Sequence, residues 1–199
     1  MNLHLENVTV SFAKGLFTPS APKGAATTVA KYNCHLLLTS GYRMVEYKGA
    51  GNFMPITPEA VITAVAQEAW KAQAATLLRT LERTRVCIRD GDTMLTKDGD
   101  IRSGYAGIKY LSLKNNNPPE VLNRDKTPIL ESDNLMTSGC VVNAIISIIA
   151  TPPGGNRSIY GLIKKIQYVR KGKDLGESGI GDFKMLPPAG DLEVDMSSL

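Results

Sequence analysis

Residues 140–170, CVVNAIISIIATPPGGNRSIYGLIKKIQYVR, form the stretch of sequence that decides the fold. Its first part, Cys140 to Thr151, is the most apolar β-like segment of the chain and predicts a central, buried strand. Pro152-Pro153-Gly154-Gly155-Asn156 is a turn sequence, and Ser158 to Arg170 predicts a return strand. We therefore expect a β-hairpin here and a β-rich core around it.

Four other segments have the pattern of strands. Leu5 to Phe12 alternates apolar and polar residues, and Thr28 to Thr39 is rich in β-branched and aromatic residues. Ile108 to Leu113 predicts a further strand, and Val121 to Asn123 a short one. The polar, Gly-rich stretch from Arg89 to Gly107 predicts turns or a hairpin.

One helix is predicted between these strands. At Thr57-Pro58-Glu59 a threonine can cap free amides, a proline fits the first helical position, and a glutamate suits the positive end of the dipole. Apolar residues then recur at helical spacing, which predicts one long amphipathic helix from about Pro58 to Arg83 and places Trp70 in the core. A mainly β chain with one long helix fits an OB-fold-like, five-stranded Greek-key barrel, complete or modified, although an α+β sandwich has the same elements.

Charge divides the chain at Lys173. Beyond this residue there are six carboxylates and one lysine, a net charge of −5. The whole chain has a net charge of +4, so residues 1–173 carry +9. We predict an OB-fold-like domain over residues 1–173 and a flexible acidic tail over residues 174–199, with Asp191, Glu193 and Asp195 as its regulatory residues. A basic body indicates a polyanionic partner, and an acidic tail indicates competition with that partner or binding of other proteins.

Several classes of protein lack support in the sequence. Three widely spaced cysteines argue against a disulfide framework, and no apolar run is long enough for a bilayer span. The first residues lack signal-peptide features, so we expect a cytoplasmic location with no membrane partner. No zinc-ligand spacing, P-loop, nucleophile elbow or dinucleotide fingerprint occurs, so we expect no metal, no cofactor and no enzymatic activity.

The triplets Asp90-Gly91-Asp92 and Asp98-Gly99-Asp100 are the most enzyme-like feature. Clustered carboxylates can bind magnesium for phosphodiester hydrolysis, but Asp-Gly is also a common turn sequence, which is the interpretation we favour. A metal-dependent nuclease stays open as an alternative function.

Cations and tyrosines are interleaved along the predicted strands and loops. Single-strand binders need cations for phosphates and aromatic faces for unpaired bases, although a tyrosine next to a lysine stem is also ordinary surface packing. The residues predicted to bind DNA are Lys31, Tyr42, Arg43, Tyr47, Lys48, Arg102, Tyr105, Lys109, Tyr110, Lys164, Lys165 and Tyr168.

A series of short motifs occurs from Arg89 onward. The strongest block comprises Arg89-Asp90-Gly91-Asp92, Gly104-Tyr105-Ala106-Gly107, Tyr110-Leu111-Ser112, Pro118-Pro119 and Asn123-Arg124-Asp125; Ser138-Gly139-Cys140, Gly161-Leu162 and Ile166-Gln167 follow. In this order the motifs resemble those of a family of bacteriophage single-stranded-DNA-binding proteins.

The resemblance covers most of Leu5 to Arg170. It implies a modified OB-fold and binding of single strands without marked sequence preference in phage replication, recombination and repair, with host cytoplasm as the location. It also implies a tail that contacts replication or recombination proteins and shields the DNA groove, although this tail ends in Leu199 without a terminal aromatic residue. The predicted helix comes earlier than in the conventional OB order. A homo-oligomer and a phage structural or interaction protein stay open as alternatives.

Overall fold

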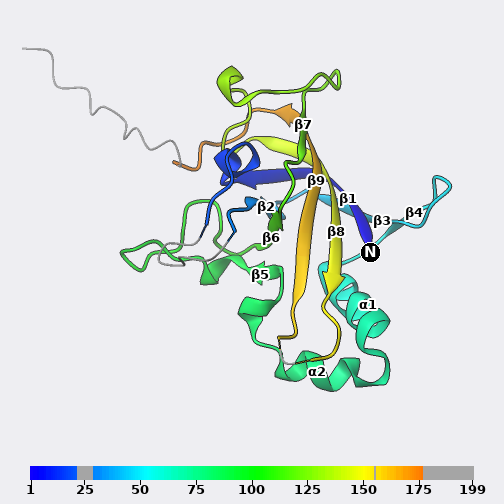
Figure 1. Cartoon of the computed structure of the whole chain (residues 1–199). Coiled ribbons are helices and arrows are strands. Elements are labelled where there is room, and N and C mark those ends of the chain that lie inside the picture. The colour runs from blue at the N-terminus through cyan, green and yellow to red at the C-terminus, as the bar shows by residue number, and fades with distance from the viewer. Residues whose placement is uncertain (22–28, 155, 177–199) are drawn as a thin grey trace, which may run out of the picture.

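Five strands pair in a ring in the computed structural model, which describes residues 1–21, 29–154 and 156–176 (Figure 1). They are β1 (Asn2–Ser11), β2 (Tyr32–Leu37), β6 (Lys109–Asn115), β8 (Val141–Ala150) and β9 (Ile159–Arg170). The ring runs β1-β2-β6-β9-β8 and returns to β1, with β6 and β9 parallel and the other pairs antiparallel. This is the five-stranded Greek-key barrel of the OB type, so the predicted fold class and the β8–β9 hairpin are confirmed.

The ring closes at a narrow seam between β6 and β9. One residue pair, Leu113 with Gly161, joins them, and a Cβ on Gly161 would lie 2.4 Å from Leu113 Cδ2. Farther along, Cys87 lies between the two strands: its N–H donates to the Ile159 carbonyl at 2.8 Å, and its carbonyl accepts from Ser112 N–H at 2.8 Å. The segment that leads into β5 (Ile88–Asp90), which pairs with β6, therefore completes the barrel wall.

The helical segment begins where the sequence predicts. Thr57 Oγ1 accepts from Ala60 N–H at 3.2 Å, and α1 spans Pro58–Trp70. Lys71 has φ +51° and begins a 3₁₀ turn, so the segment continues as a separate helix, α2 (Ala74–Thr80), and ends three residues early. Trp70 is buried and its Nε1 donates to the Thr151 carbonyl at 2.7 Å, which confirms its place in the core.

Both helices lie at one end of the barrel, beside the turn between β8 and β9 (Figure 1). They come between the second and third strands of the ring, earlier in the chain than the conventional OB helix. Within the described ranges, no helix is long and apolar enough to cross a bilayer.

Shorter elements surround the barrel. A hairpin of β3 (Arg43–Tyr47) and β4 (Phe53–Pro55) extends the sheet beyond β1, and neither strand is predicted from the sequence. The predicted short strand is confirmed as β7 (Glu120–Leu122), which pairs with β9. Four further 3₁₀ turns span Ala13–Leu16, Arg83–Arg85, Gly91–Thr93 and Glu131–Asp133.

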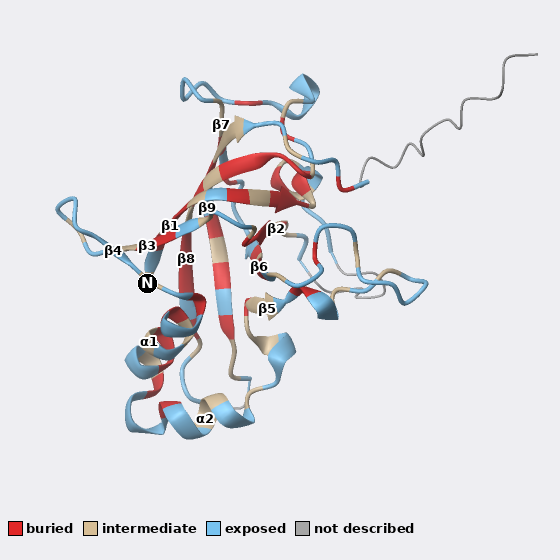
Figure 2. Cartoon of the chain, turned by 180° about the vertical axis from the view of Figure 1, so that it is seen from behind, coloured by how far each residue is buried: buried red, intermediate tan, exposed pale blue. Residues whose placement is uncertain are grey.

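Two apolar clusters stabilise the body. The larger fills the barrel and includes residues from all five of its strands, visible as the buried stretches of β1, β8 and β9 in Figure 2. The smaller consists of Leu37, Tyr105, Tyr110 and Leu175.

Because Leu175 is only 8% exposed, the packed body includes residues beyond the predicted boundary at Lys173. The predicted tail residues Asp191, Glu193 and Asp195 lie outside the described residues.

The three cysteines are buried and unpaired, as expected for reduced thiols. Burial raises the pKa of Cys34 and of Cys87 to about 12, so both are poor nucleophiles.

Candidate nucleic-acid interface

A groove of about 700 Å³ lies on the outer surface of the barrel where β2, β5, β6 and β9 come together. Four cations line it: Lys31, Arg85, Arg89 and Lys114. Among the described residues that line it there is no aspartate or glutamate. We call this hollow the basic groove. Its charge favours a polyanionic ligand.

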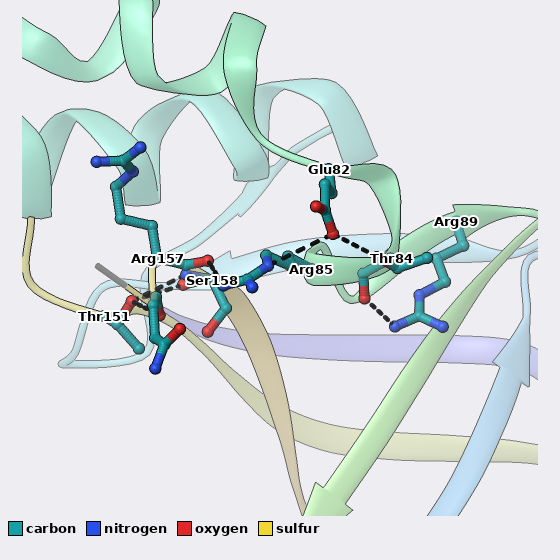
Figure 3. Close-up of polar contacts among 8 residues, drawn as sticks. Glu82, Thr84, Arg85, Arg89, Thr151, Arg157 and Ser158 are labelled. Carbon is teal, nitrogen blue, oxygen red and sulfur yellow. Dashed lines mark hydrogen bonds and ion pairs between the residues drawn. The ribbon is translucent and has the colours of Figure 1, made fainter. Parts of the chain in front are cut away.

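The two arginines are held by the turn that leads from the helices to β5 (Figure 3). Arg89 Nε donates to the Val86 carbonyl at 2.9 Å, and its Nη2 donates to the Thr84 carbonyl at 2.5 Å. Both acceptors are neutral, so they fix the guanidinium without cancelling its charge. Arg85 lies 3.6 Å from Glu82 in an exposed ion pair, which water and salt weaken.

The two lysines come from neighbouring strands. Lys114 is exposed on β6, directly opposite Asn33 of β2, and Lys31 precedes β2. Within the described part of the chain, Lys31, Arg89 and Lys114 form no ion pair. Their charges therefore remain available to a ligand.

His35 is a partly buried imidazole on this side of the barrel. Its pKa is lowered to about 3, first by burial and then by the charges of Arg89, Arg102 and Lys114. His35 is therefore neutral at physiological pH, and the positive charge of the surface comes from arginine and lysine.

Tyr160 supplies the groove with an aromatic surface. On β9 it alternates with the buried Ile159 and Gly161, so its ring faces outward and is 40% exposed. The nearby turn is closed by Thr151, whose Oγ1 accepts from Ser158 N–H at 2.9 Å (Figure 3). Asn115, Asn116 and Asn117 line the groove as well. Cations for phosphates next to a ring that can stack on a base are the requirements of single-strand binding.

The structure places the sequence-predicted residues at several sites. Of the twelve, only Lys31 lines the basic groove. The prediction is wrong for Tyr105 and Tyr110, which are 0% and 2% exposed and have no ring face free for a base. The loop between β5 and β6 folds back and packs these two rings into the smaller apolar cluster.

Four predicted cations form ion pairs with carboxylates elsewhere on the surface. The pairs are Arg43 with Glu6 at 3.4 Å, Lys48 with Glu46 at 3.5 Å, Lys165 with Glu120 at 2.8 Å, and Lys109 with Glu59. Exposed pairs of this kind are weak, but each carboxylate lowers the local positive potential. A fifth predicted cation, Arg102, stacks over the Phe12 ring at 4.5 Å.

The remaining predicted residues also lie outside the groove. Tyr42 packs against the main core, and Tyr168 is half-buried with Arg124 5.9 Å from its ring centre. Tyr47 is 38% exposed on β3. Lys164 is exposed on β9, with Nζ 3.3 Å from Asn2 Oδ1.

Sequence reasoning missed Arg85, Arg89, Lys114 and Tyr160 as candidate binding residues. A signal was present, because Arg83 and Arg85 come shortly before Arg89, the first residue of the Arg-Asp-Gly-Asp motif, and the three form a short basic run. This run contains no tyrosine, so the interleaving of cations with tyrosines does not mark it.

The Asp-Gly-Asp triplets form turns, as favoured from the sequence. Asp90 Oδ1 accepts from Asp92 N–H at 3.1 Å, and Asp92 Oδ1 accepts from Gly107 N–H at 2.7 Å. Gly91 is required sterically, since a Cβ there would lie 2.0 Å from the Tyr105 carbonyl oxygen. In the part of the chain that the structure describes, no three His, Cys, Asp or Glu side chains are grouped so as to hold a metal ion.

Barrel connectivity and a cation-lined outer groove define the class of the protein as an OB-fold binding protein. The family model described as "Enterobacter phage Enc34, ssDNA-binding protein" matches residues 1–185, and the chain belongs to this family. This confirms the resemblance stated from the motifs.

Solved structures agree on the fold. The single-stranded DNA-binding protein of bacteriophage Enc34, solved in complex with ssDNA, has a TM-score of 0.56 at 15% identity, covering 88% of this chain and 89% of that one. A second structure of that protein has a TM-score of 0.54 at 15% identity, covering 90% of this chain and 86% of that one.

A curated relative is the "Putative protein p50" of Acyrthosiphon pisum secondary endosymbiont phage 1. It is 32% identical over 100 residues, and the match spans half of this chain and half of the relative.

Proposed function

We propose that this protein is a sequence-nonspecific single-stranded-DNA-binding protein whose strand lies in the basic groove. The observation that carries the proposal is the set of four cations beside the exposed ring of Tyr160, with no carboxylate among the described lining residues. The cations contact phosphates and the ring stacks on a base. Neither contact depends on base identity, so the binding has little sequence preference.

The family supports this proposal. Its model is named for a phage ssDNA-binding protein, and the Enc34 protein was solved with ssDNA bound. We propose that the role is to protect and organise single strands during phage DNA replication, recombination and repair in the host cytoplasm. The acidic residues that follow the described body are proposed to compete with DNA and to contact replication or recombination proteins.

A titration with fluorescently labelled oligo-dT tests the binding function. An external label is needed because Trp70 is buried and bonded to Thr151, so its emission is a poor reporter of the surface. We expect tight binding at low salt, a steep loss of affinity with salt and a clear preference over duplex of equal length. No binding at low salt, or equal affinity for duplex, contradicts the proposal.

The same labelled strand distinguishes a binder from a nuclease. Incubated with the protein and magnesium or manganese, it should stay intact over hours. Cleavage that disappears in the Asp90→Asn variant would instead support the metal-dependent alternative.

A further inference from the structure

An exposed aromatic cluster lies outside the basic groove, on the β3–β4 hairpin and the adjoining part of β1. Tyr47, Phe53 and Met54 are 38%, 44% and 48% exposed. The ring centres of Tyr47 and Phe53 lie 5.3 Å apart, and His4 lies 5.6 Å from the first and 5.0 Å from the second. We call these four residues the hairpin patch.

The hairpin patch is not part of either apolar core. All three residues of β4 are exposed, and β4 is the edge strand of the sheet, so its rings have no covering layer within the described body. Figure 1 shows the hairpin projecting away from the barrel. Large apolar side chains gathered at such a position mark a binding surface rather than a contribution to folding.

The register of the sheet connects this patch with the basic groove. On β9, Tyr160 and Leu162 line the groove; Leu162 pairs with Ser147 of β8, and Ser147 pairs with Asn2 of β1. Adjacent strands are spaced about 4.8 Å apart, so β9 and β1 are about 10 Å apart across the surface. His4 follows two residues after Asn2 and lies on the same face of the strand.

A cation lies between the two surfaces. Lys164 is exposed at a bulge in β9, and its Nζ lies 3.3 Å from Asn2 Oδ1, at the start of the strand that carries His4. Lys48, next to Tyr47, adds a second cation at the hairpin, partly balanced by Glu46. Rings flanked by cations favour a ligand with flat apolar faces and negative charge over an apolar protein surface.

We propose that the hairpin patch is a second base-stacking subsite for the DNA strand that occupies the basic groove. Resting on the proposed function, this inference extends the path of the strand from Tyr160, past Lys164, to Tyr47 and Phe53. A short oligonucleotide fills the groove alone. A longer one reaches the hairpin as well and gains affinity from stacking on its rings.

Affinity as a function of oligonucleotide length tests the second subsite. Labelled oligo-dT of about 6 and about 16 nucleotides, which lie within the range of OB-fold footprints, are titrated against wild type and the Tyr47→Ala/Phe53→Ala variant. We expect about tenfold weaker binding of the long strand, corresponding to the loss of a stacked base, and unchanged binding of the short one.

Two controls make the result specific. Leu130→Ala removes an apolar side chain that is 62% exposed and belongs neither to the basic groove nor to the hairpin patch, and it should change neither affinity. Tyr160→Ala removes the ring in the groove and should weaken both lengths about equally. Urea unfolding of each variant verifies that the fold is intact.

The other outcomes overturn the proposal in distinguishable ways. Equal affinities of wild type and the hairpin variant for the long strand show that no base stacks there. Unchanged DNA binding with a smaller assembled species on sizing shows that the patch joins copies of the chain. If wild type binds neither oligonucleotide, the proposed function itself fails.

Discussion

The hydroxyl oxygen of Tyr105 lies 2.8 Å from Nδ1 of His35, inside the body of the protein. The same hydroxyl donates to Ser11 Oγ at 2.8 Å, so the contact with His35 takes its proton from Nδ1. This chain of polar groups joins the loop that carries Tyr105 to β1 and β2. The tyrosine of the Gly-Tyr-x-Gly motif therefore has a structural role.

Replacing this tyrosine should affect stability and leave DNA binding intact. In Tyr105→Phe the ring still fills the cluster, but His35 Nδ1 and Ser11 Oγ lose a buried partner, at a cost of about 1–3 kcal/mol. We expect the urea midpoint to fall and the affinity for oligo-dT to stay the same. Tyr160→Phe, an exposed counterpart, should leave stability unchanged. Weaker DNA binding by Tyr105→Phe at wild-type stability would mean that Tyr105 contacts the strand.

Stability should fall when the solution becomes mildly acidic. The unfolded chain protonates His35 below about pH 6.5, whereas the folded protein keeps it neutral until its pKa of about 3. The unfolded state therefore binds more protons between these limits, and the unfolding free energy decreases as pH falls through them. From about pH 7 to about pH 5.5 we expect a loss of about 1 kcal/mol in urea unfolding. A wild-type protein with the same pH dependence as His35→Gln would show that burial of this imidazole has no such effect.

Removal of the acidic residues should strengthen DNA binding if the cut preserves Leu175. Residues 177–199 contain five carboxylates and one lysine, a net charge of −4. A chain that ends at Gly176 should bind oligo-dT severalfold more tightly at low salt and converge with the full chain at high salt, because salt screens the competition.

Leu175→Ala in the full chain is the matched control for this truncation. It removes a side chain that is packed against Tyr105 and Tyr110, so it should lower stability by about 2 kcal/mol without tightening DNA binding. Equal affinity of the truncated and full chains at low salt would rule out shielding of the groove.

Much of the barrel could be predicted from local sequence patterns. The alternation in residues 5–12, the apolar run before Pro152 and the helix start at Thr57 depend on burial and capping, which act over a few residues. The β3–β4 hairpin was missed because its strands are short and one of them is exposed throughout. No glycine or proline marks the break at Lys71 in the sequence.

The binding surface was harder to predict because it is assembled across strands. Gly104 precedes Tyr105 and Lys109 precedes Tyr110, neighbours that are typical of surface tyrosines, yet the fold-back of one loop buries both rings. Lys114 and Arg89 come from different strands and line the same groove only because β5 and β6 pair. Pairs of neighbouring residues in sequence cannot show this, since adjacent residues in a strand face opposite sides of the sheet.

The salt dependence of oligo-dT affinity in Lys114→Ala tests the central claim most directly. Each phosphate contact with a single strand contributes about −0.7 to the slope of log affinity against log salt concentration, so four groove cations give about −3. We predict that Lys114→Ala weakens binding and reduces the steepness of the slope by about 0.7, while Lys97→Ala, on the exposed loop outside the groove, changes neither. Wild-type affinity and slope in Lys114→Ala would contradict binding of the strand in the basic groove.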